Sequence, residues 1–153
     1  MRLARTSFAA EEIRNFLAQS PSQNPLIQNY FAQFLLITLY SEAEQSVKNI
    51  KLRRLRGVND EKIASFISRT NDGMIKRVKK AEINDVLSKF NCGEGDVIGR
   101  RLQGQQLQPY FDAITNRHLV CHGNGSEMTL DDVIEAISCA EMILNELEVA
   151  LNE

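Results

Sequence analysis

Apolar side chains recur at intervals of three and four residues along most of the chain, which is the spacing of one face of an α-helix. Runs in which apolar and polar residues alternate strictly, as in a half-buried β-strand, are few. The pattern therefore predicts an all-α fold: a helical bundle of about five to seven helices, with a long second helix and a long C-terminal helix, that forms a single domain over residues 1–153.

The first predicted helix runs from Ser7 to Ala18, with Ser7 as its N-cap and a polar loop after it. The second helix is expected to start at Pro25 and to continue to Arg56, with Gly57 just beyond its end. Its apolar positions keep the helical period and are expected to form its buried face: Leu26, Tyr30, Phe31, Phe34, Leu35, Thr38, Leu39, Val47, Ile50 and Leu55.

Shorter helices are expected in the middle of the chain. Asp60 and Glu61 open one that continues through Ile67, and Ala81 to Phe90 forms another. A turn is predicted at residues 71–73 and a loop at residues 91–96, because both stretches combine Asn or Asp with Gly.

Two helices close the chain. One carries Leu107, Tyr110, Phe111, Ile114 and Cys121 on one side and ends at the glycine-rich residues 123–126. The other is capped by Thr129, with Asp132 three residues later as in a capping box. Its buried stripe is expected to contain Leu130, Val133, Ile134, Ile137, Ala140, Ile143 or Leu144, Leu147 and Leu151.

Composition is that of an ordinary globular domain, with 43% hydrophobic and 25% charged residues. The longest apolar run, residues 30–40, is too short to span a bilayer, so a cytoplasmic protein with no membrane association is expected. The three cysteines have neither a metal-ligand spacing nor an even count, which favours reduced thiols and predicts no metal and no cofactor.

The net charge of −2 conceals an uneven distribution. Residues 48–101 contain fourteen Lys and Arg against seven Asp and Glu, whereas eight acidic residues and no basic ones follow Arg117. Such a basic segment can follow a nucleic-acid backbone, although the charges alone favour a solvated helix face that the acidic tail neutralises. The candidate RNA-binding residues are Lys48, Lys51, Arg53 and Arg54.

The candidate chemistry lies in residues 116–123, which hold both histidines of the chain, His118 and His122, together with Arg117. Arginine grips phosphate oxygens with two parallel hydrogen bonds, and histidine moves protons near neutral pH. Cleavage of RNA needs little else, because the ribose 2′-OH supplies the nucleophile within the substrate. Each residue also has a structural interpretation, as a helix-terminal charge or a C-terminal cap.

The order of these features resembles the HEPN superfamily, a group of all-α domains that cleave RNA or bind nucleotides. Its mark is an arginine, a polar residue, three or more others, and a histidine, at the junction of the last two long helices. Arg117 matches the arginine, His118 the polar position and His122 the histidine. The Tyr-x3-Glu pair of one HEPN type matches Tyr40 and Glu44 on the long second helix.

The resemblance implies a metal-independent endoribonuclease whose two copies form a symmetric homodimer with one composite active site. His122 would act as general base or acid, Arg117 would clamp the phosphate, and His118 would help to orient either. Glu44 would hold Arg117 through an ion pair, with Tyr40 and Asn116 as further supporting residues. Many relatives are toxins or phage-defence effectors, so an antitoxin partner, nucleotidyltransferase-like or of another kind, is also implied.

Two alternatives stay open at the level of sequence. One is a non-catalytic HEPN-like helical module that binds nucleotides or proteins. The other is an unrelated helical adaptor that binds nucleic acid by charge alone and loses affinity steeply with salt. The presence of an arginine and two histidines together at one helix end favours the ribonuclease over both.

Overall fold

The computed structural model describes residues 2–19, 24–72, 78–122 and 126–153. These residues form seven helices and no strand, so the all-α prediction with a long second and a long last helix is confirmed. The helices are α1 (Ala4–Gln19), α2 (Pro25–Leu55), α3 (Glu61–Asp72), α4 (Lys80–Lys89), α5 (Val97–Arg101), α6 (Gln108–Cys121) and α7 (Leu130–Asn152). No helix in these ranges is long and apolar enough to cross a bilayer.

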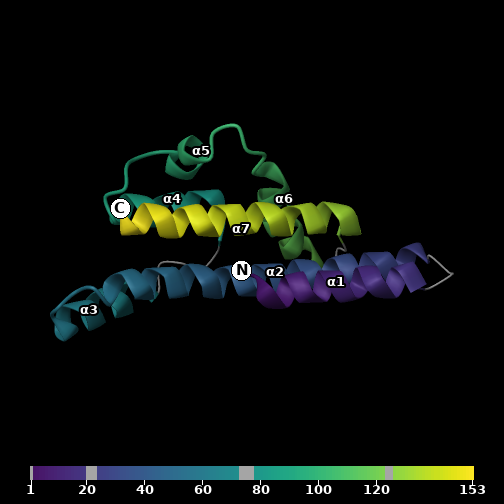
Figure 1. Cartoon of the computed structure of the whole chain (residues 1–153), viewed down its shortest axis with the longest axis horizontal. Coiled ribbons are helices and arrows are strands. Elements are labelled where there is room, and N and C mark those ends of the chain that lie inside the picture. Colours follow the sequence, from purple (N-terminus) through teal and green to yellow (C-terminus); the bar gives the residue numbers. More distant parts are fainter. Residues whose placement is uncertain (1, 20–23, 73–77, 123–125) are drawn as a thin grey trace.

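The two long helices, α2 and α7, run side by side and form the centre of the bundle (Figure 1). Helix α6 packs against both of them, α1 lies along the N-terminal half of α2, and α4 and α5 cover the C-terminal half of α7. Helix α3 lies beyond the others, at the far end of α2. The core contains fully buried leucines from both long helices, among them Leu35, Leu39, Leu144 and Leu147.

Helix α7 follows its sequence closely. The Thr129 hydroxyl accepts the Asp132 N–H at 3.2 Å, and the Asp132 carboxylate accepts the Thr129 N–H at 2.8 Å, which completes the predicted capping box. The predicted stripe packs in or against the core, and both Ile143 and Leu144 are buried.

Helix α1 starts three residues earlier than predicted, at Ala4, so the assignment of Ser7 as its N-cap is wrong. The cap comes from elsewhere in the chain. The Glu42 carboxylate on α2 accepts the backbone N–H groups of Arg5 at 3.1 Å and Thr6 at 2.9 Å, and the Thr6 hydroxyl at 2.7 Å. The Glu141 carboxylate on α7 accepts the Leu3 N–H at 2.7 Å. Free N–H groups at a helix start need such acceptors, and carboxylates supply them well.

Two further elements differ from the predictions. Helix α3 continues to Asp72, so the turn predicted at residues 71–73 does not begin there, and Gly73 lies outside the described residues. Helix α5 was not predicted, because five residues give too little periodicity; Asp96 caps it by accepting the Gly99 N–H at 3.1 Å. The glycines at 123 and 125 also lie outside the described residues.

The predicted buried face of α2 is correct at Leu35 and Leu39 and wrong at three positions of its first half. Leu26, Tyr30 and Phe34 are 55%, 60% and 53% exposed. The buried positions there are Ala32, Leu35 and Leu36. Apolar residues occur on more than one side of α2, so periodicity alone could not select the side that α6 and α7 cover.

Candidate active site

The end of helix α6 presents the predicted motif. The backbone N–H of His122 closes the last turn on the carbonyl groups of His118 at 3.3 Å and Leu119 at 3.1 Å, so His122 is the C-cap. The His118 and His122 rings stand one turn apart with their centroids at 4.4 Å and an angle of 69° between their planes. Both side chains are exposed, so both are accessible to a substrate. Cys121 is also exposed, contrary to its predicted place on the apolar side of this helix.

Arg117 points from α6 towards α2. Its guanidinium carbon lies 4.0 Å from the centroid of the Tyr40 ring, which is a cation–π contact. Its Nε atom is buried and has no hydrogen-bond partner among the described residues. A buried N–H group without an acceptor is costly and uncommon in native proteins. The site therefore holds a donor that an anionic oxygen would satisfy.

Tyr40 is held in place from its own helix by Glu44. Burial raises the pKa of the Tyr40 phenol to about 12, and a hydrogen bond to Glu44 and its negative charge add to the effect. The phenol is therefore neutral at physiological pH and presents an intact aromatic face to Arg117. The predicted ion pair between Glu44 and Arg117 is absent from the described residues, and Tyr40 connects the two instead.

A pocket of about 140 Å³ lies beside these groups, lined by Tyr40, Lys79, Ile114, Thr115, Arg117, His118 and Leu119. Lys79 adds a second permanent cation to the site. Sequence analysis placed this lysine only in a general run of basic residues, and it lies 38 residues from Arg117 in the chain. No pattern within a short stretch of sequence could have predicted that Lys79 and Arg117 line the same pocket.

The lysine is positioned by the core. Val78 is fully buried, and its carbonyl oxygen accepts the hydroxyl of the equally buried Tyr110, on α6, at 3.0 Å. The Lys79 N–H donates to Glu82 in the first turn of α4 at 2.8 Å. Helix α6 therefore carries Arg117 on one side of the pocket and, through Tyr110, holds the backbone next to Lys79 on the other side.

Asn116 has a structural part in the site. Its amide nitrogen donates to the Asp112 carbonyl group at 3.1 Å, and its amide oxygen accepts the Glu127 N–H at 3.3 Å. These bonds tie the end of α6 to the chain segment that leads into α7.

The predicted RNA-binding residues on α2 do not form one surface. Lys51 is buried, Arg53 is bonded to Glu148 of α7 at 3.1 Å, and Lys48 and Arg54 are exposed. Successive residues of a helix turn by about 100°, which separates the four side chains around its axis. The four residues therefore stay individual candidates for RNA contact and do not form one continuous basic face.

No group of three or more His, Cys, Asp or Glu side chains in the described ranges is placed to hold a metal ion. The site brings together two imidazoles, a guanidinium, an ammonium and a phenol.

Comparison with known proteins identifies the family. The chain matches the family model described as RiboL-PSP-HEPN over residues 4–153. Searches of curated proteins and of solved structures gave no match. Since the match covers nearly the whole chain, including α6 and its Arg117-to-His122 motif, this protein belongs to the RiboL-PSP-HEPN family of the HEPN superfamily.

Proposed function

We propose that this protein is a metal-independent endoribonuclease that acts as a symmetric dimer with a composite active site. The observation that carries the proposal is the arrangement at the end of α6, where Arg117 holds a buried N–H without an acceptor and lines one pocket with His118, whose ring contacts that of His122. Arginine and histidine in this arrangement meet the needs of phosphodiester cleavage in RNA.

The reaction is an intramolecular displacement at phosphorus. His122 removes the proton of the ribose 2′-OH, the 2′-oxygen bonds to phosphorus, and the bond from phosphorus to the 5′-oxygen breaks. A second imidazole gives its proton to the departing 5′-oxygen. The products are a 2′,3′-cyclic phosphate and a 5′-OH, and no water is consumed. Arg117 binds the non-bridging oxygens, and Lys79 adds charge stabilisation on the pocket side.

The exposure of His122 supports the dimer. Its side chain is exposed and is not among the residues that line the pocket beside Arg117. The His122 imidazole can therefore contact RNA that is bound between two copies of the chain. In the composite site one copy supplies the base and the other supplies the acid.

The size of the pocket separates this proposal from a non-catalytic nucleotide-binding module. Small-molecule sites usually enclose about 300–1,000 Å³. A pocket of about 140 Å³ suits one phosphodiester group better than a complete nucleotide.

We further propose that the protein is the toxic or effector half of a toxin–antitoxin or defence system and is restrained by an antitoxin. This part rests on the family resemblance. Expression of wild type and of Arg117→Ala in a bacterial host tests it: wild type alone is expected to arrest growth, and equal growth of both strains would contradict the assignment.

The catalytic proposal is tested by incubating a labelled mixed-sequence RNA with purified protein in EDTA. Cleavage with cyclic-phosphate ends is expected for wild type, and a loss of about 100-fold or more for Arg117→Ala and for His122→Ala, as for other transition-state groups. Arg14→Ala, an exposed arginine of α1, is the matched control and should retain activity. Equal cleavage by all variants, or none by wild type, would refute the proposal.

A further inference from the structure

Two apolar surfaces of this chain have no partner helix in the described structure. The first, here called the α2 stripe, consists of Leu26, Ile27, Tyr30, Phe34 and Ile37, which are 38% to 60% exposed. The spacing of its last four residues is three, four and three, as in the seam of a coiled coil. A helix normally turns such a seam towards another helix.

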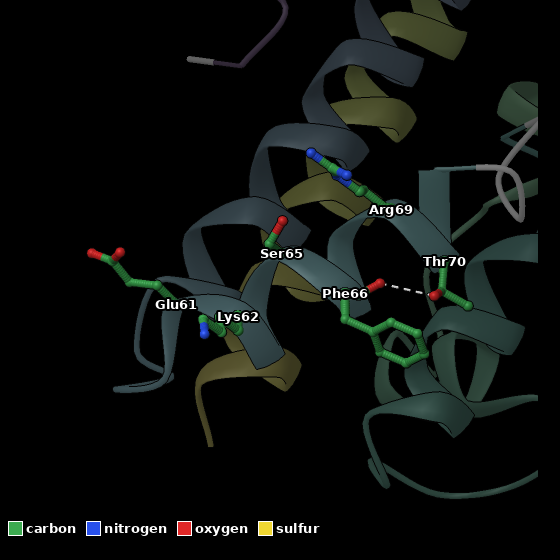
Figure 2. Close-up of a pocket in the computed structure, with 6 residues that line it drawn as sticks. All are labelled: Glu61, Lys62, Ser65, Phe66, Arg69 and Thr70. Carbon is green, nitrogen blue, oxygen red and sulfur yellow. Dashed lines mark hydrogen bonds between the residues drawn. The ribbon is translucent and has the colours of Figure 1, made fainter.

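The second surface, here called the α3 arm, is the outer face of α3. Ile63 and Phe66 are 51% and 71% exposed. The arm packs mainly against the end of α2 and lies away from the other helices (Figure 1). A hollow lies beside Phe66, and among the described residues six side chains of α3 line it, which Figure 2 draws: Glu61, Lys62, Ser65, Phe66, Arg69 and Thr70.

The hollow has a volume of about 660 Å³, larger than the pocket beside Arg117. A single helix cannot enclose a small ligand, so we interpret it as open surface for a large side chain of another chain. Its apolar wall is the Phe66 ring, and its polar edges are formed by Lys62 and Arg69.

The two surfaces lie on either side of the candidate active site. The stripe is centred near residue 32 of α2, and the arm follows the end of α2 at Leu55. The point halfway between the stripe and the arm along α2 is therefore at about Glu44. Seven residues are nearly two helical turns, so Tyr30, Ile37 and Glu44 lie almost in line along α2. Phe34 and Leu55 are three such steps apart, and Leu55 is buried at the end of α2, just before the chain leads into α3.

We infer that the α2 stripe binds the α3 arm of a second copy of this chain. Two copies of α2 that run antiparallel about a twofold axis near Glu44 bring each stripe onto the other copy's arm, so one symmetric interface covers both surfaces. The inference rests on the proposed function in one respect, since the same axis places the two Tyr40–Arg117 sites near each other, as a composite site requires.

The exposed area is sufficient for a stable dimer. The seven side chains are on average about half exposed, and at about 200 Å² for a large side chain they leave roughly 700 Å² of apolar surface per copy. A standard interface buries about 800 Å² per partner.

The experiment measures the mass of the full chain in solution by light scattering over a series of concentrations. Wild type is expected to be a dimer, and Phe34→Asp and Phe66→Asp are expected to weaken dimerisation at least tenfold. Tyr30→Asp repeats the test on the stripe if Phe34→Asp fails to fold by circular dichroism. Val149→Asp, an exposed apolar residue of α7, is the matched control and should remain dimeric.

Mixing the two variants tests the pairing itself. A heterodimer of Phe34→Asp with Phe66→Asp keeps one stripe-to-arm contact in the wild-type form, so the mixture should dimerise more strongly than either variant alone. A monomeric wild type, a fully dimeric Phe66→Asp variant, or a mixture no stronger than its components would overturn the inference. RNA cleavage is measured in parallel: a cleaving monomer refutes the interface and the composite dimeric site but leaves the ribonuclease activity standing, and an inactive dimer with the expected pairing refutes only the ribonuclease.

Discussion

Replacement of Tyr40 by leucine removes the aromatic face beneath the Arg117 guanidinium and keeps an apolar side chain in a position that is only 6% exposed. A cation–π contact contributes about 0.5–1 kcal/mol at exposed sites and about 2 kcal/mol when desolvated. At 4.0 Å and with Nε buried, the Arg117 contact belongs towards the upper part of this range. A loss of about 1–2 kcal/mol in the transition state lowers kcat/KM roughly 5- to 30-fold.

The assay is single-turnover cleavage of labelled RNA in EDTA by folded Tyr40→Leu protein. Tyr40→Phe is the matched control, because it retains the ring and removes only the hydroxyl that bonds to Glu44. It is expected to stay within about threefold of wild type, since phenylalanine also accepts a cation on its face. Full activity of Tyr40→Leu, or an equal loss in both variants, would show that the stacked ring is not what positions the arginine.

A double-mutant cycle separates this effect from general damage. If Tyr40 acts through Arg117, then adding Tyr40→Leu to Arg117→Ala should cost little further activity. Additive losses would mean that the two residues act independently and that the contact observed between them has no part in catalysis.

Four further predictions follow from the same structure. Burial works to raise the pKa of the Glu42 carboxyl, but hydrogen bonds from α1 lower this pKa overall, so the stabilisation that the carboxylate gives should be complete above pH ~4.3 and be lost as the pH falls further. Glu42→Gln should lower the free energy of unfolding in urea by about 1–2 kcal/mol at pH 7, and the difference between the two proteins must be smaller at pH 3. The raised pKa of Tyr40 acts in the opposite direction, because the unfolded chain loses the phenol proton at a lower pH than the folded protein does. Wild type should therefore lose stability relative to Tyr40→Phe between pH 10 and pH 12, and a constant difference in unfolding free energy over that range would contradict this prediction. Tyr110→Phe leaves the buried Val78 carbonyl group without its donor and should lower the unfolding free energy by about 1–3 kcal/mol, so an unchanged denaturation midpoint would exclude that role. Lys79→Ala should weaken RNA binding and reduce the slope of log affinity against log salt by about one, and an unaltered slope would place this lysine off the RNA path.

The parts of the fold that could be predicted from sequence are those that short-range interactions determine. Thr129 and Asp132 cap α7 within one turn, and the 23 residues of that helix repeat the apolar period often enough to define its buried face. The start of α1 could not be found in the same way. Its cap is Glu42, whose carboxylate reaches Thr6 across 36 positions of the chain. Sequence patterns carry no information about an acceptor at that distance.

The same distinction applies to the site. Arg117, His118 and His122 could be proposed from the sequence because their spacing is a local motif, and Tyr40 and Glu44 because of the family pattern. Lys79 was missed as a site residue, since only the packing of α6 beneath Val78 brings it to the pocket. The exposure of Tyr30 and Phe34 was missed because apolar periodicity describes a buried face and an interface in the same terms.

The spacing of the motif gives a physical reason for a site shared between two chains. On a helix, residues four apart lie on one side, whereas residues five apart differ by about 140° in direction. His118 and His122 accordingly stand together, with 4.4 Å between their ring centroids, while Arg117 turns inward onto Tyr40. One copy can therefore clamp a phosphate against its own α2 and still present an imidazole outward. In the proposed mechanism, a ligand that contacts the guanidinium and an imidazole on different sides is better served by the arginine of one copy and the outward histidine of another, and association of two chains is then a condition of the proposed chemistry.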